Sequence, residues 1–118
     1  MTNLVRALLV AGWLLVAWAT WRAIAAMGAG AAGDVFLGDL AHPWRGQFNF
    51  DFLAHLVLVG AWLGWTAQRR LAAPVIAVLA VLGGGLFSFA YLLARSFAGD
   101  GSIAHLLLGR HYRSGSAV

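Results

Sequence analysis

The sequence predicts an all-α integral membrane protein, a helical bundle of three transmembrane helices followed by a short amphipathic C-terminal helix. Of its 118 residues, 62% are hydrophobic and 10% are charged, whereas about 25% are charged in a typical soluble domain. The mean hydropathy is +0.82, and the apolar residues form runs close to the roughly 20 residues that cross a bilayer. We expect one membrane domain over residues 1–118, with spans at about 4–27, 52–68 and 73–94.

The charged residues favour a membrane surface over a nucleic-acid partner. Net charge is +4, every basic residue is an arginine and every acid is an aspartate. Arginines near spans anchor them and set their orientation. We expect membrane lipids as partners and no nucleic acid. Arg69 and Arg70 favour a cytoplasmic N-terminus in a bacterial inner membrane, and three spans then place the C-terminal tail outside.

The first span, residues 4–27, has Arg6 near one end and Arg22 near the other. A signal peptide has a similar layout of a basic residue, an apolar stretch and small residues. The apolar stretch continues from Trp21 to Met27, which is long for a signal peptide. We therefore expect a retained span.

The connection over residues 28–51 is predicted to be an interfacial loop. Phe36, Leu40 and Trp44 recur every four residues, as in a short helical turn on the membrane surface, and Pro43 is expected to stop that turn. The loop is either an aromatic anchor or a lid that brings His42, Trp44 and Arg45 over the second span.

Helix packing is predicted for the second and third spans. Gly60 and Gly64 form a G-x-x-x-G pair, which permits close approach of another helix. The third span has Pro74 in its first turn and a small-residue ridge that includes Gly84 and Ser88. In the tail, residues 95–113, Ser102 is expected to cap a short helix over 103–108 that ends at Gly109.

A polar cluster is predicted where the first helix ends, the second begins and the third ends. Asp51 opens the second span and His55 follows one turn deeper. A carboxylate at membrane depth is costly unless it is paired. The cluster is either a structural staple or a ligand-binding site, and it comprises Arg22, Trp44, Arg45, Asp51, His55, Tyr91 and Arg95.

Other chemistry finds little support in the sequence. There are no cysteines, which excludes disulfides and thiolate metal sites. We found no catalytic, phosphate-binding or dinucleotide-binding motif, so we expect neither an enzyme, nor a metal site, nor a cofactor. Haem ligation would need a second deep histidine beside His55, and proton passage would need a second deep titratable group.

The run from Asp39 to Arg70 resembles a family of small bacterial membrane proteins known as a domain of unknown function. The likeness covers residues 35–95. It rests on the acid at Asp39, Pro43 with Trp44, Asp51, either Trp62 or Trp65, and the closing arginines, while Gln68 replaces the usual acid before them. It implies a helix, an extracytoplasmic loop and two more helices, and no activity.

The sequence leaves two functions open. The small-residue faces and the lack of a sizeable soluble part favour an accessory or structural subunit that packs against other membrane subunits or against itself. The alternative is a binder of a hydrophobic or amphipathic ligand, such as a quinone, lipid or pigment, in an outer-leaflet pocket around Asp51 and His55.

Overall fold

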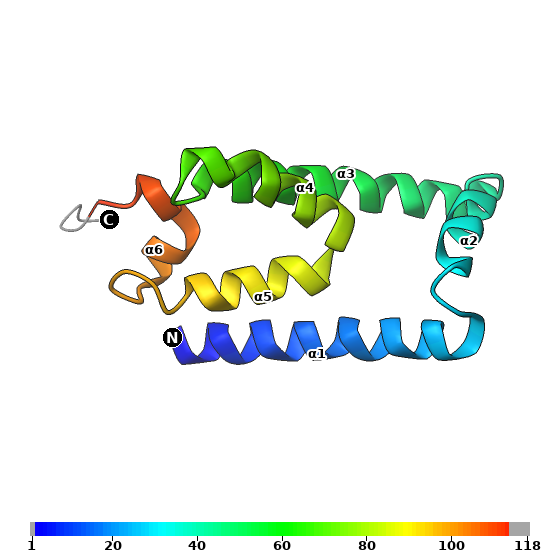
Figure 1. Ribbon diagram of the computed structural model, residues 1–118, viewed down its shortest axis with the longest axis horizontal. Coiled ribbons are helices and arrows are strands. Elements are labelled where there is room, and N and C mark those ends of the chain that lie inside the picture. Colours follow the sequence, from blue (N-terminus) through cyan, green and yellow to red (C-terminus); the bar gives the residue numbers. More distant parts are fainter. Residues whose placement is uncertain (1, 114–118) are drawn as a thin grey trace.

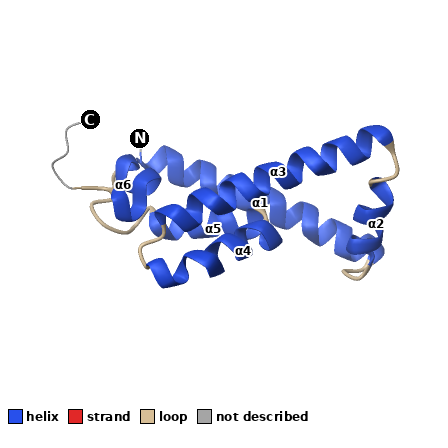
Figure 2. Cartoon of the chain, turned by 90° about the horizontal axis from the view of Figure 1, so that it is seen from above, coloured by secondary structure: helices blue, strands red, loops and turns tan. Residues whose placement is uncertain are grey.

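The computed structural model describes residues 2–113, and all regular elements in that range are helical (Figures 1 and 2). The all-α prediction is therefore confirmed. The helices are α1 (Thr2–Met27), α2 (Ala31–Asp39), α3 (Pro43–Thr66), α4 (Ala73–Gly83), α5 (Gly85–Arg95) and α6 (Ile103–Leu108), with 3-10 turns η1 (Arg70–Ala72) and η2 (Gly109–His111).

Two long antiparallel helices form the frame of the molecule. α1 has 26 residues and α3 has 24, about 39 and 36 Å at 1.5 Å per residue. Both are long and apolar enough to cross a membrane by length and composition. In Figure 1, α2 joins them at one end, and α6 lies at the other end near the N-terminus.

The predicted third span is wrong, because residues 73–94 form a hairpin rather than one continuous helix. The break falls at Gly84, whose φ of 53° and ψ of −138° suit glycine and few other residues. α4 and α5 have 11 residues each, about 16 Å, so the hairpin enters between α1 and α3 and turns back about half way (Figure 1).

Close backbone contacts hold the hairpin to the frame. A β-carbon on Gly60 would lie 2.9 Å from the Ala77 carbonyl oxygen, and one on Gly64 would lie 3.1 Å from that of Ala73. On the other side α5 packs along α1, where a β-carbon on Gly12 would lie 2.8 Å from the Phe89 ring. The face of α3 that carries Gly60 and Gly64 thus packs against α4, and not against α5.

Two other predicted packing residues lie elsewhere than expected. Gly84 forms the hairpin turn and is not part of a continuous ridge. Ser88 lies on α5, beyond that turn, and its buried Oγ has no hydrogen-bond partner among residues 2–113. The ridge was wrong because it assumed one unbroken helix.

The predicted start of the second long helix is also wrong. α3 begins at Pro43, and His42 caps it by accepting a hydrogen bond from the backbone N–H of Arg45 (3.3 Å). Proline is well suited to the first helical position, where its missing N–H costs little. Asp51 therefore lies inside α3 and not at its N-terminus. Residues 31–39 of the predicted loop form α2.

Candidate functional site

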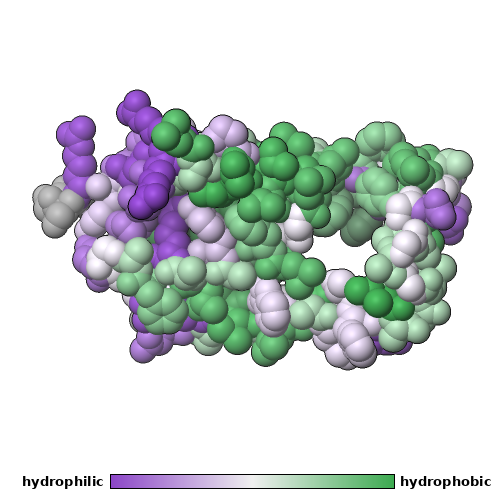
Figure 3. All heavy atoms as spheres, in the orientation of Figure 1, coloured by the Kyte–Doolittle hydropathy of each residue, from purple (hydrophilic) through white to green (hydrophobic). Residues whose placement is uncertain are grey.

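The hairpin separates the molecule into two ends with different chemistry. We call the end formed by α2 and the adjoining ends of α1 and α3 the open end. The arginine end is the opposite one, where the N-terminus, the hairpin base and α6 lie (Figure 1). It holds six of the eight arginines, namely Arg6, Arg69, Arg70, Arg95, Arg110 and Arg113. Figure 3 shows hydrophilic residues gathered there.

The predicted polar cluster is divided between these ends. Arg95 Nη1 donates to Thr66 Oγ1 at 2.7 Å, and Thr66 follows Asp51 by fifteen residues along α3, about 22 Å. Tyr91 is one turn before Arg95 on α5. The single cluster is therefore wrong, because a hairpin returns residues 85–95 to the end from which α4 started.

The cluster residues that remain at the open end form small, exposed pairs. His55 Nδ1 lies 2.8 Å from the Asp51 carbonyl oxygen and 3.2 Å from Asp51 Oδ1. Arg45 Nε lies 2.9 Å from Asp39 Oδ1. The side chains of Asp51 and His55 are 57% and 69% exposed, so this pair lies on the outer surface of α3 and not inside a pocket.

Two further cluster residues are also on the surface. The Arg22 guanidinium stacks over the Trp18 ring at 5.0 Å on the same helix. Trp44 is 78% exposed in the first turn of α3. An exposed indole at a helix end agrees with an interfacial anchor. Neither residue contacts the Asp51 and His55 pair through a hydrogen bond or ion pair in the described chain.

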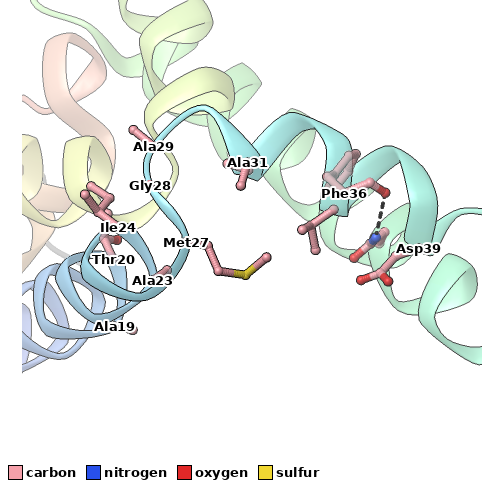
Figure 4. Close-up of a pocket in the computed structure, with 13 residues that line it drawn as sticks. Ala19, Thr20, Ala23, Ile24, Met27, Gly28, Ala29, Ala31, Phe36 and Asp39 are labelled. Atoms are coloured by element: carbon pink, nitrogen blue, oxygen red, sulfur yellow. Dashed lines mark hydrogen bonds between the residues drawn. The ribbon is translucent and has the colours of Figure 1, made fainter.

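The sequence did not reveal the main cavity of the open end. It has a volume of about 640 Å³, and Figure 3 shows the opening between the two long helices. Figure 4 shows its walls, with Met27 extending between α1 and the α2 side. Small and apolar residues dominate the lining, which consists of Ala19, Thr20, Ala23, Ile24, Met27, Gly28, Ala29, Ala31, Ala32, Val35, Phe36, Asp39 and Asn49.

The few polar groups of this cavity already have partners within the chain. Thr20 Oγ1 donates to the Val16 carbonyl at 2.7 Å, and Asn49 Nδ2 donates to the Phe36 carbonyl at 3.4 Å. Asp39 is paired with Arg45. Because these groups are satisfied, the cavity presents mainly hydrocarbon to any occupant.

The arginine end is held by hydrogen bonds between distant segments. Arg6 donates to Ser96 through Nε (3.1 Å to Oγ) and Nη2 (2.7 Å to the carbonyl). Trp62 Nε1 donates to the Leu107 carbonyl at 3.1 Å. The Arg6 bonds join the start of α1 to the end of α5, and the Trp62 bond joins the last turns of α3 to α6.

The tail adds a second set of contacts at the arginine end. Ser102 caps α6 by accepting from the His105 backbone N–H, and Gly109 ends the helix. Asp100 accepts hydrogen bonds from the Tyr112 hydroxyl and the Ser102 backbone N–H. Tyr112, followed by Ser102, lowers the pKa of Asp100 to about 2, and the carboxylate raises the pKa of Tyr112. The loop between α5 and α6 is thus tied to the end of the described chain.

Within residues 2–113, no three or more His, Asp or Glu side chains are grouped so as to hold a metal ion.

Comparison with protein-family models, curated proteins and solved structures finds no match to this chain.

Proposed function

We propose that the chain is an integral membrane protein in which α1 and α3 cross the bilayer and the α4–α5 hairpin enters half way. The exposure of its apolar residues supports this. Within residues 2–113 the buried hydrophobic residues are only Leu9, Leu63, Ala67, Ala80 and Leu106, whereas large side chains along α1 and α3 are exposed. Contiguous apolar surface of this extent is rare in soluble monomers.

Two backbone hydrogen bonds hold the hairpin turn, and each pairs a donor and an acceptor that lipid could not satisfy. The Gly84 N–H donates to the Ala80 carbonyl and the Ser88 N–H donates to the Gly84 carbonyl, each at 3.0 Å. Non-helical backbone at membrane depth is tolerated where protein surrounds it, and here α1 and α3 flank the turn.

The arginine distribution supports a cytoplasmic arginine end. Three of the four aspartates, Asp34, Asp39 and Asp51, belong to the open end with only Arg22 and Arg45. The positive-inside rule therefore favours a cytoplasmic location for both the N-terminus and the tail. A continuous third span would instead put the tail on the outside, and its arginines would then oppose a cytoplasmic N-terminus.

We further propose that the open end takes up the hydrocarbon part of an amphipathic molecule, such as a lipid or quinone. The observation that carries this is the cavity of about 640 Å³ with its mainly apolar lining. Its volume lies within the range of about 300–1,000 Å³ usual for small-molecule sites. Asp39, which lines the cavity and pairs with Arg45, is suited to lie beside a polar headgroup.

Native mass spectrometry after gentle extraction tests this proposal. Ala23 lines the cavity, whereas Ala25, two residues away on α1, is exposed and not part of the lining. We expect Ala23→Trp to abolish a reproducible bound mass and Ala25→Trp to retain it. Retention of that mass in Ala23→Trp would contradict occupancy of this cavity.

A second candidate is the accessory-subunit function. α1 packs mainly on α5 and α3 mainly on α4, and the structure shows no extensive direct packing of α1 on α3. A helix of another subunit, or of a second copy, would fill the same opening. The same spectra distinguish the candidates, because a subunit shows protein partners or a homo-oligomer that Ala23→Trp dissociates.

A further inference from the structure

Arg95 carries a buried charge that no acidic residue of the described chain neutralises. The residue is 5% exposed, and the one hydrogen bond of its side chain within residues 2–113 goes to the neutral Thr66 hydroxyl. Its Nε and Nη2 have no hydrogen-bond partner there. Its guanidinium also lies over the Trp62 ring, 6.0 Å from the ring centroid, which is a neutral partner too. An arginine remains protonated in proteins, and a buried charge without a counter-charge is costly. The site is therefore complementary to an anion.

The aspartates of the chain cannot serve as that anion in this structure. Asp39 pairs with Arg45 and Asp51 with His55, both at the open end. Asp34 lies in the first turn of α2 at the same end. Asp100 is the one aspartate at the arginine end, and its carboxylate accepts hydrogen bonds from Tyr112 and Ser102.

Arg95 lines a groove of about 320 Å³ at the base of the hairpin. The polar members of the groove are Gln68, Arg69, Tyr91 and Arg95, and the apolar members are Ala72, Ile76, Ala94 and Ala98. Arg69 is exposed, and its side chain has no hydrogen-bond or ion-pair partner in the described chain. The groove therefore has the exposed Arg69 and the buried Arg95 among its lining residues, beside an apolar wall.

We propose that this groove binds the phosphate of an anionic phospholipid. Arg69 donates hydrogen bonds directly to the phosphate oxygens, since guanidinium groups match phosphate geometry. Arg95 in the wall supplies uncompensated positive charge, and the alanine and isoleucine side chains contact the glycerol and upper acyl region. A lipid headgroup reaches the groove only if α1 and α3 span a bilayer, so we rest this on the membrane placement proposed above, but not on occupancy of the open-end cavity.

Lipid retention on the intact protein tests the assignment. The protein is placed in nanodiscs of phosphatidylcholine with phosphatidylglycerol, extracted gently and analysed by native mass spectrometry. We expect bound phosphatidylglycerol to fall at least ten-fold in Arg69→Gln. Arg70→Gln is the matched control, because Arg70 is adjacent and exposed but does not line the groove. Equal retention by both variants and the unaltered protein would overturn the proposal.

Two additional measurements are made. One tests whether the bound anion is a lipid or free phosphate, and the other tests whether the protein is inserted in a membrane. Competition by millimolar inorganic phosphate that removes the bound lipid completely would overturn a lipid-specific site in favour of a free-anion site. Arg95→Gln is expected to reduce retention as well, and Arg69→Gln keeps the test valid if Arg95→Gln does not fold. Resistance of the unaltered protein to alkaline extraction tests membrane insertion separately from lipid retention.

Discussion

The two ends of this molecule are built from the same two long helices, yet only one end is tightly packed. At the arginine end, the hairpin fills the space between α1 and α3, and α6 is joined to α3 by the Trp62 hydrogen bond. At the open end, the same helices enclose a cavity of about 640 Å³. The difference follows from the 11-residue lengths of α4 and α5, which reach only part of the way along the frame.

The residues that stabilise the fold and those available for binding therefore lie mainly at different ends of the molecule. Buried polar contacts and glycine contacts concentrate at or near the arginine end, so substitutions there are expected to affect stability. Exposed pairs and apolar walls characterise the open end, so substitutions there are expected to affect ligands or partners more than the fold.

The largest loss of stability is expected for Gly109→Val. Gly109 has a φ of +54°, and a β-carbon there would overlap the Thr66 carbonyl oxygen. A β-branched residue in this conformation, combined with the clash, should lower the free energy of unfolding by about 3 kcal/mol or more. Thermal unfolding in detergent measures the effect. Gly38→Ala is the control, since a β-carbon at Gly38 meets nothing within 4 Å, and an equal loss in both would contradict the special role of Gly109.

A smaller loss is expected for Gly60→Leu at the contact of α3 with α4. The added side chain would force apart the backbones of Gly60 and Ala77, and such overpacking costs about 1–3 kcal/mol. The same substitution at Gly33, where a β-carbon is unobstructed, should have little effect. Unchanged unfolding of Gly60→Leu would show that the hairpin does not pack here.

These glycines also show how much could be predicted from the sequence. The pair Gly60 and Gly64 and the caps Ser102 and Gly109 depend on local spacing, and the structure has them in those local roles. The hairpin could not be predicted in this way, because residues 73–94 are long enough for a complete crossing. The run of three glycines at residues 83–85 fits both a close helix contact and a turn, and only the packing of α4 and α5 on two different helices selects the turn.

The candidate site was less accessible to sequence reasoning than the helices. Every placement of Tyr91 and Arg95 depended on the direction in which their helix runs, so one missed turn moved both to the opposite end. Pro43 was similarly ambiguous, since proline both stops a preceding helix and begins a new one. The cavity arises from the shortness of the hairpin, which no single residue type signals.

At the open end, Asp51→Asn is expected to change stability by no more than about 1 kcal/mol. The Asp51 and His55 pair is exposed on α3, and exposed ion pairs contribute about 0–1 kcal/mol. Thermal unfolding in detergent again measures the effect. A loss comparable to that of Gly60→Leu would contradict a weak, exposed pair on the surface of α3.

The smallest effect is expected from the Asp100 and Tyr112 contact, and it depends on pH. The hydrogen bond from Tyr112 lowers the pKa of Asp100 to about 2 from its ordinary value of 3.8, so its contribution to stability is present above pH 3.8 and is lost as the pH falls towards 2. The unfolding temperature of Tyr112→Phe should therefore lie slightly below that of the unaltered protein near pH 5. The two should converge near pH 2, and a difference that grows on acidification would contradict this sign.

The half-way membrane entry proposed for the α4–α5 hairpin is tested most directly by cysteine labelling, because the chain has no cysteines of its own. Single cysteines replace Arg70, Ala98 and Ala41, which are all exposed residues. Each variant is treated with a membrane-impermeant maleimide in oriented vesicles. The hairpin predicts that positions 70 and 98 label from one side and position 41 from the other. Labelling of 70 and 98 from opposite sides would mean a third complete crossing and would contradict the hairpin.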